Sequence, residues 1–153
     1  MISFRPARPD DAAAVTQLCL RSKAVWGYSD EFMAACRAEL TLTPEAIASS
    51  QVEVAEQDGS LIGMSQLVMR DGIAVLDKLY VAPEAVRSGA GRALFRRVMA
   101  AARAGGAAVM TIDADPNAAE FYRRMGAVDD GTVVSGSIAG RVLPRLKVEF
   151  GGG

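Results

Sequence analysis

The sequence predicts an α+β fold, a mixed sheet with helices on both faces, and three observations support this prediction. Two Asp-Gly pairs, at residues 58–59 and 71–72, separate three strand-like segments, which predicts an antiparallel meander over residues 52–81. Segments with a helical period lie before and after the meander. A strand, a helix and a strand follow one another over residues 73–113, and such a unit places its two strands parallel.

The part of the chain before the meander is predicted to form one strand and three helices. Residues 2–6 have a strand-like pattern, and Asp10 and Asp11 place negative charge where a first helix would begin. Ser29 and Thr43 are typical N-cap residues for a second helix and a short third one.

The part after the meander is predicted to alternate between helices and strands. The expected elements are a helix that begins at Gly89 and stops at residues 105–106, a buried strand over 107–113, a short helix over 115–125, and strands over 128–135 and 142–150. We expect a single domain over residues 1–150 and a flexible tail over residues 151–153.

Composition excludes several kinds of site. The chain of 153 residues has no histidine, which excludes histidine-based nucleophile pairs and histidine metal ligands, and we expect no metal. A net charge of −1 gives no bulk attraction to nucleic acid or an anionic membrane. Cys19 and Cys36 lie in apolar helical stripes and are expected to be buried, reduced thiols. Without a membrane-spanning run or a signal peptide, we expect a soluble cytoplasmic protein.

The segment over residues 79–94 contains the first functional signal. A strand ends, a turn follows, and a helix begins at Gly89 and Gly91. The first N–H groups of a helix lack internal partners, so this segment could form an anion site suited to a pyrophosphate. Arg87 and Arg92 could add charge-assisted hydrogen bonds. The alternative is that these glycines only form a turn. The segment has neither the lysine of a Walker loop nor the third glycine of a Rossmann fingerprint.

A second signal comes one strand later, where residues 113–127 read Asp-Ala-Asp-Pro-Asn-Ala-Ala-Glu-Phe-Tyr-Arg-Arg-Met-Gly-Ala. Together with residues 79–94, this stretch resembles the GNAT superfamily of acyl-CoA-dependent N-acyltransferases. Residues 5–12 are similar to the passage from first strand to first helix in that family, so the resemblance covers nearly the whole chain. It implies the GNAT fold, a mostly antiparallel sheet of about six or seven strands with a V-shaped splay between strands 4 and 5.

The resemblance also implies acetyl-CoA as cosubstrate and assigns roles to particular residues. The strand at Leu79 would offer main-chain groups to the pantetheine arm, and residues 87–92 would wrap the pyrophosphate. Asn117 matches an asparagine that contacts the cofactor arm, and Tyr122 matches a tyrosine that protonates the departing CoA thiolate. The expected cofactor-binding residues are Leu79, Tyr80, Val81, Arg87, Ser88, Gly89, Ala90, Gly91, Arg92, Asn117 and Phe121.

Some of these residues have structural interpretations as well. Tyr122 could be an interior tyrosine, and Asn117 has Glu120 three residues later, which is the spacing of a capping box. The sequence departs from the family pattern at Val86, where a glutamine or arginine is usual and where Arg87 follows instead. Because main-chain N–H groups provide most of the phosphate binding, we expect binding to survive this change.

Acyl transfer to an amine requires the amine to be neutral. Because the chain has no histidine, the proton of the amine must be removed by a carboxylate, by a water chain or by the pocket itself. Asp77 is the candidate catalytic base because it interrupts an apolar strand two residues before Leu79, on the same predicted face. The main-chain N–H of Leu79 is the candidate donor to the developing oxyanion. The alternative role of Asp77 is an ion pair with Lys78 or a nearby arginine. Glu31 is a further candidate, although it also fits a helix N-terminus.

In GNAT folds the acceptor enters between the first helices and the last strands. Trp26 and Tyr28 lie in the corresponding region and could form a wall for an amine, and Arg141 could bind a substrate carboxylate. The alternatives are a hydrophobic staple for Trp26 and a plain surface charge for Arg141. We expect a small-molecule or peptide amine as acceptor. The resemblance also implies that a homodimer could form through the last strands.

The expected function is N-acetyl transfer from acetyl-CoA to a primary amine by direct attack in a ternary complex. One alternative is a non-catalytic acyl-CoA-binding or sensor protein on the same fold. Another is a different nucleotide-binding protein that uses residues 87–92 for phosphate.

Overall fold

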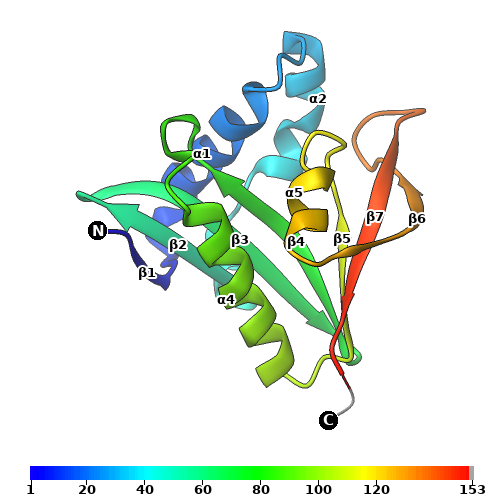
Figure 1. Cartoon of the computed structure of the whole chain (residues 1–153). Coiled ribbons are helices and arrows are strands. Elements are labelled where there is room, and N and C mark those ends of the chain that lie inside the picture. Colours follow the sequence, from blue (N-terminus) through cyan, green and yellow to red (C-terminus); the bar gives the residue numbers. More distant parts are fainter. Residues whose placement is uncertain (152–153) are drawn as a thin grey trace.

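The computed structural model describes residues 1–151 and contains one seven-stranded sheet, in the order β1-β2-β3-β4-β5-β7-β6 (Figure 1). Only β4 and β5 pair in parallel, and every other neighbouring pair is antiparallel. This confirms the predicted mixed, mostly antiparallel sheet. The strands are β1 (Ser3–Pro6), β2 (Gln51–Gln57), β3 (Ser60–Arg70), β4 (Ile73–Val81), β5 (Val109–Asp113), β6 (Val128–Val134) and β7 (Val142–Glu149).

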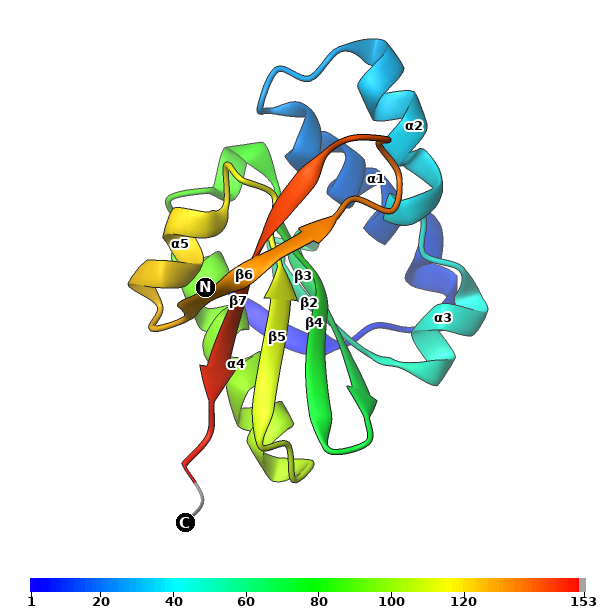
Figure 2. The ribbon, with the colours of Figure 1, turned by 90° about the vertical axis from the view of Figure 1, so that its right-hand side faces the viewer.

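Helices cover both faces of the sheet, as predicted (Figure 2). The helices α1, α2 and α3 pack on one face, and α4 and α5 pack on the other. None of the helices within residues 1–151 is long and apolar enough to cross a membrane. The helices are α1 (Ala12–Ala24), α2 (Asp30–Leu40), α3 (Pro44–Ser49), α4 (Ala90–Ala104) and α5 (Ala119–Arg124), with 3₁₀ turns at Pro9–Asp11 and Pro83–Ala85.

The predicted caps and hairpin turns have clear structural signatures. The Ser29 hydroxyl accepts a hydrogen bond from the Phe32 N–H at 3.1 Å, which fixes the start of α2. Thr43 caps α3 in the same way. Asp58 and Asp71 have positive φ angles of 52° and 49°, as do the glycines that follow them. Two consecutive left-handed residues are typical of a two-residue hairpin turn, so the predicted meander is confirmed.

The buried apolar residues form two cores. The first joins residues of α1, α2 and α3 to β2 and β3, and it also includes Ala90 and Leu94 from the N-terminal part of α4. The second joins the rest of α4 and α5 to β5 and β7. Cys19 and Cys36 lie in the first core as free, buried thiols, as predicted. Burial raises the pKa of the Cys19 thiol to about 12, with Lys78 acting in the opposite direction, so this cysteine stays protonated at neutral pH.

The two parallel strands separate halfway along β4. Their pairing runs from Ile73↔Val109 to Leu76↔Ile112, whereas β4 continues to Val81. The register of β4 against β3 also shifts at this point, because Leu76 faces Leu67 but Lys78 faces Gln66, which leaves Asp77 as the extra residue of a bulge. Beyond Leu76, the edge of β4 that faces β5 therefore has no strand partner within residues 1–151. The splay predicted between strands 4 and 5 is confirmed (Figure 1).

Most strand and helix boundaries differ from the prediction by no more than two residues, and the largest difference is at α5. The helix expected over residues 115–125 begins only at Ala119, because the Asp115 carboxylate and the Asn117 N–H form a turn of their own at 2.8 Å. Residues 152 and 153 of the predicted flexible tail lie outside the described residues. The assignment of residues 1–150 to one domain stays a prediction.

Candidate active site

The loop that leads into α4 presents main-chain N–H groups to the outside. Of the six positions from 87 to 92, Ser88 donates its N–H to the Ala85 carbonyl at 3.0 Å, and Ala90 donates to the Ser88 hydroxyl at 3.2 Å. The N–H groups that find no acceptor within residues 1–151 are those of Arg87, Gly89, Gly91 and Arg92. Open N–H groups at the positive end of a 15-residue helix favour an anion.

The two glycines of this loop serve different purposes. Gly89 has a φ of +88°, and a Cβ atom placed there would meet nothing within 4 Å, so the residue is needed for backbone conformation and leaves open space. A Cβ atom on Gly91 would lie 3.4 Å from Val81 Cγ2 and 3.6 Å from Phe121 Cε1. These are ordinary contact distances, and they show that the first turn of α4 lies next to both β4 and α5. The predicted cofactor residue Phe121 packs behind the loop.

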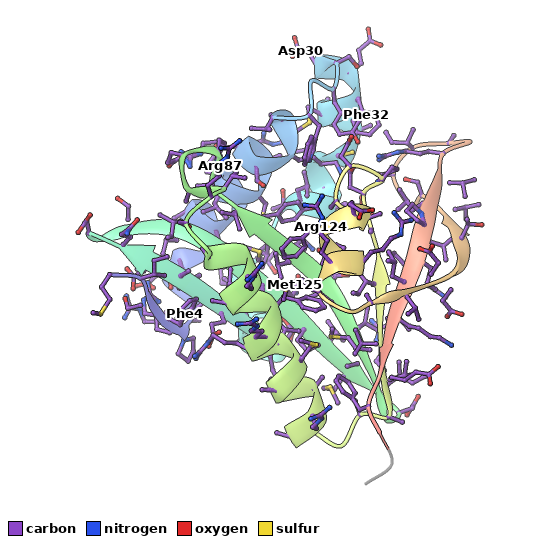
Figure 3. The ribbon with its side chains drawn as sticks, viewed as in Figure 1. Phe4, Asp30, Phe32, Arg87, Arg124 and Met125 are labelled. Carbon is purple, nitrogen blue, oxygen red and sulfur yellow. The ribbon has the colours of Figure 1, made fainter. Side chains whose placement is uncertain are left out.

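Two arginines flank the open N–H groups. Arg87 and Arg92 are exposed, and neither forms an ion pair with any described residue. Figure 3 shows Arg87 in the loop ahead of α4. Val86, which departs from the family pattern, is exposed and contributes no polar group here. Both guanidinium groups are thus available to an anion bound at residues 87–92.

Tyr122 is buried in α5, beside Phe121, whose ring lies close to Gly91. Its side chain is 6% exposed and packs against Phe95 and Phe121, with ring centroids 5.7 and 5.2 Å away. Its hydroxyl has no hydrogen-bond partner within residues 1–151, yet no fully buried polar side-chain atom in that range lacks one, so the hydroxyl keeps some exposure. Burial, and secondarily the charge of Asp115, raises the pKa of Tyr122, so it stays protonated at neutral pH.

A polar cleft of about 170 Å³ lies beside the splay, lined by β4, the end of β5, α2 and the loop between β6 and β7. Tyr80 lines it, and burial raises the pKa of this tyrosine well above its usual value. Asp77 also lines the cleft, with its side chain 46% exposed and its Oδ2 atom 2.8 Å from Lys78 Nζ. The ion pair considered from the sequence is therefore present. The bulge at Asp77 removes the basis for placing it on the same face as Leu79.

Asp115 is the centre of a cluster of polar side chains at the edge of this cleft. Lys23 Nζ lies 3.1 Å from its Oδ2 atom, the Tyr28 hydroxyl 2.8 Å, and Arg141 Nη2 3.4 Å. The Asp115 side chain is 10% exposed. Burial disfavours its charge, but hydrogen bonds from the Asn117 N–H and Tyr28 and the charge of Lys23 outweigh that effect, so the pKa of Asp115 is lowered.

Aromatic rings hold the cations of this cluster in place. Tyr28 stacks on Phe32 with ring centroids 4.0 Å apart, and Phe32 extends from α2 (Figure 3). The Arg141 guanidinium carbon lies 4.8 Å from the Phe32 centroid, and Lys23 Nζ lies 5.6 Å from that of Tyr28. The alternative interpretation of Arg141 as a plain surface charge is therefore wrong.

Asn117 belongs to the same cluster. Its amide donates to the Tyr28 hydroxyl at 2.9 Å and to Asp115 Oδ1 at 3.0 Å. The capping box with Glu120 is absent, because Ala118 occupies the N-cap position of α5 and makes no side-chain cap bond. In this structure the side chain predicted to contact the cofactor arm links the loop before α5 to Tyr28, in the segment between α1 and α2.

Two predicted acceptor residues are not brought to the cleft. Trp26 is exposed in the segment between α1 and α2, and Glu31 is exposed in the first turn of α2. Neither lines the cleft. Their role in acceptor binding stays a prediction without support from this geometry.

Sequence reasoning missed three residues of the site. Lys23 and Phe32 complete the Asp115 cluster, and a lysine within the apolar stripe of α1 was the one available signal for it. Glu39 lines the cleft and accepts a hydrogen bond from the Ser137 hydroxyl at 3.0 Å, and it forms no ion pair with a described residue. Its position near the exposed end of α2 gave no signal.

Comparisons with known proteins show which family this chain resembles in sequence and in fold. The family model of the acetyltransferase (GNAT) domain matches residues 25–136. No curated protein sequence matches the chain. A GCN5-related N-acetyltransferase from Rhodopseudomonas palustris superposes with a TM-score of 0.82 at 26% identity, covering 97% of this chain and 95% of that one.

Two further solved structures share the fold and were solved with ligands. A PaiA N-acetyltransferase from Thermoplasma acidophilum in complex with coenzyme A gives a TM-score of 0.81 at 18% identity, covering 98% of this chain and 99% of that one. N-acetylglutamate synthase from Neisseria gonorrhoeae, complexed with coenzyme A and N-acetyl-glutamate, gives 0.70 at 20% identity, covering 97% of this chain and 35% of that one. Since the family model covers well over half of the sequence, this chain belongs to the GNAT family of acetyltransferases.

Proposed function

We propose that the chain transfers an acetyl group from acetyl-CoA to a primary amine while both substrates are bound. The observation that carries this proposal is the meeting of three features at the splay. Open N–H groups precede α4, Tyr122 packs on Phe121, whose ring lies next to Gly91, and the polar cleft opens beside β4. Gly91 connects these features physically, because it packs against both Val81 of β4 and Phe121, the neighbour of Tyr122.

The residues present fit the shape and charge of acetyl-CoA. The open N–H groups of residues 87–92, with Arg87 and Arg92, would bind the pyrophosphate. The unpaired edge of β4 beyond Leu76 would hydrogen-bond the pantetheine amides as an added strand does. That two structures with the same fold were solved with coenzyme A supports acetyl-CoA as the cosubstrate.

Acetyl-CoA supplies a thioester, whose C–S bond breaks as the C–N bond to the amine forms. An ammonium substrate loses two protons in the net reaction: one ends on the CoA thiol and the other leaves the protein. Tyr122 would donate a hydrogen bond to the departing sulfur. The raised pKa of Tyr122 keeps the proton on the phenol. Complete transfer of this proton to the thiolate is therefore less favourable than it would be from an unperturbed tyrosine.

A carboxylate of the cleft would accept the first proton. Asp77, the candidate from the sequence, is already bound to the Lys78 ammonium. Glu39 lines the same cleft and has no cation partner within residues 1–151, so we add it as a second candidate base. The main-chain N–H of Leu79 remains the proposed donor to the carbonyl oxygen.

The test is a thiol-release assay with acetyl-CoA and a panel of amines. Turnover with any amine above the no-amine control supports the proposal. Tight binding of CoA without turnover across the panel would instead indicate a non-catalytic acyl-CoA-binding protein. Tighter binding of ATP or a dinucleotide than of CoA would indicate a different nucleotide-binding protein.

A further inference from the structure

The Asp115 cluster, which comprises Lys23, Tyr28, Asp115, Asn117 and Arg141, has an uncompensated positive charge. Lys23 and Arg141 both contact Oδ2 of the one carboxylate, at 3.1 and 3.4 Å. The charged side chains of Lys23, Asp115 and Arg141 are largely removed from water, so the excess charge is poorly screened. A second anion placed here would therefore be favoured.

Arg141 has donors left for that anion. Its Nη2 atom donates to the Tyr28 hydroxyl at 2.9 Å and reaches Asp115, whereas Nε and Nη1 have no acceptor within residues 1–151. The side chain is 17% exposed and lines the cleft. Its guanidinium is held by Phe32 and Tyr28, so the free edge needs little ordering before it binds. A free guanidinium edge suits a planar carboxylate.

Another part of the cleft wall has the opposite charge. Glu39 from the end of α2 lines the cleft without a cation partner in residues 1–151. Asp77 lines it from the β4 bulge, paired with Lys78, which also lines the cleft, so Glu39 is the carboxylate of this pair that has no cation partner. An ammonium group would be attracted to these carboxylates. The cleft therefore pairs a carboxylate site with an ammonium site within about 170 Å³.

We propose that the acceptor is a small amine that itself carries a carboxylate, of which an α-amino acid is the simplest kind. This rests on the proposed function and names the acceptor for it. Arg141 binds the carboxylate of the acceptor, and Glu39 or Asp77 takes one proton from its ammonium group. The nitrogen then forms the amide bond as the thioester C–S bond breaks, and the second proton ends on the CoA thiol.

The test compares each of a set of L-amino acids with its own carboxamide in the thiol-release assay. The carboxamide has a less basic amine, so any intrinsic bias favours the amide. We expect kcat/KM for the best acid to exceed that of its amide by about tenfold to a hundredfold, the usual effect of a charged hydrogen bond. Equal or faster reaction of the amides, or turnover of simple amines but of no amino acid, would overturn the proposal.

Variants of Arg141 separate an effect on recognition of the carboxylate from an effect on folding. Arg141→Gln is expected to bring the acid-to-amide ratio close to one by slowing only the acids, and Arg141→Lys is expected to restore part of the ratio. Arg37→Gln removes a charge from the exposed surface of α2 and should leave the ratio unchanged. A variant that is merely unstable would lower both rates together. If Arg141→Gln keeps the ratio of the unaltered protein, the carboxylate site is not at Arg141.

The outcomes also distinguish failure of the acceptor proposal from failure of the proposed acetyl transfer on which it rests. Amine turnover without a preference for carboxylates would refute the acceptor class and leave acetyl transfer standing. Absence of turnover with every amine and every amino acid would refute acetyl transfer, and the acceptor proposal with it.

Discussion

The two halves of the candidate site are built in different ways. The half proposed for the cofactor consists of main-chain N–H groups from one continuous stretch, residues 87–92. The half proposed for the acceptor is assembled from side chains far apart in the sequence, since Tyr28 meets Arg141 across 113 positions and Asp115 across 87. A local motif can reveal the first kind of site, whereas only the folded chain reveals the second.

The difference implies different sensitivities to mutation. The side-chain half depends on buried charges, so removal of one member should affect the stability of the whole protein. The main-chain half depends on backbone conformation at an exposed loop, so changes there should affect ligand binding more than stability.

The largest expected effect is that of Asp115→Asn on stability. The change leaves the Lys23 and Arg141 cations without their shared anion in a largely buried place, which should lower the free energy of unfolding by about 3 kcal/mol. Urea denaturation measures this loss. Asp30→Asn in the exposed first turn of α2 is the matched control and should change stability by less than about 0.5 kcal/mol. A similar midpoint for both variants would show that the cluster is not a stabilising network.

The next effect concerns catalysis. Tyr122→Phe should lower kcat at least about tenfold and leave CoA affinity almost unchanged, because the hydroxyl would act only on the sulfur that leaves. Since that hydroxyl has no internal hydrogen bond within residues 1–151, the variant should unfold at nearly the same temperature as the unaltered protein. Steady-state kinetics and calorimetry give both quantities. Equal rates for the two proteins would remove Tyr122 from the mechanism.

Substitutions of Gly89 and Gly91 are expected to have smaller effects, and to differ in their effect on the KM for acetyl-CoA. Gly89 has a left-handed backbone conformation, which costs an alanine about 1–2 kcal/mol. In Gly89→Ala the exposed loop can relieve this cost by changing conformation, which would turn its N–H groups away from the ligand. The KM for acetyl-CoA should rise about fivefold to tenfold. In Gly91→Ala the new methyl group would make ordinary contacts with Val81 and Phe121, so that KM should change less than about twofold. The reverse order of effects would mean that Gly91, and not Gly89, borders the ligand.

The smallest expected effect is a feature of the pH–rate profile. A tyrosine with a raised pKa loses its proton only above the usual value of about 10, so Tyr122 should remain a donor throughout the range from pH 7 to about 9.5. The kcat/KM for an amine should rise over this range as the ammonium loses its proton, and then level off. A falling limb below pH 9 that disappears in Tyr122→Phe would show that its pKa is not raised.

Much of the fold could be predicted from the sequence because its signals are local. The Ser29 cap, the two Asp-Gly turns and the glycines around α4 each depend on neighbours within a few residues. The bulge at Asp77 could not be found in this way, because it depends on the register between β3 and β4. The alternation that predicts Asp77 and Leu79 on one face of the strand fails at that residue.

The acceptor side was harder to predict for the same physical reason. Asp115 was interpreted only as part of a helix start, although its carboxylate meets a lysine 92 positions away. The spacing of Asn117 and Glu120 predicts a capping box, but Asn117 binds Tyr28 and Asp115 in its place, and its contact with the cofactor arm stays a prediction. Contacts across such separations depend on how α1, α5 and the β6–β7 loop come together at the splay.

The central claim is that the open N–H groups between Arg87 and Arg92 bind the pyrophosphate of acetyl-CoA. Amide NMR of ¹⁵N-labelled protein during titration with CoA tests it most directly. We expect the largest shifts at Arg87, Gly89, Gly91 and Arg92, saturating with CoA, and smaller shifts at Ser88 and Ala90, whose N–H groups are already paired. Saturation that leaves the amides of residues 87–92 unmoved would contradict it.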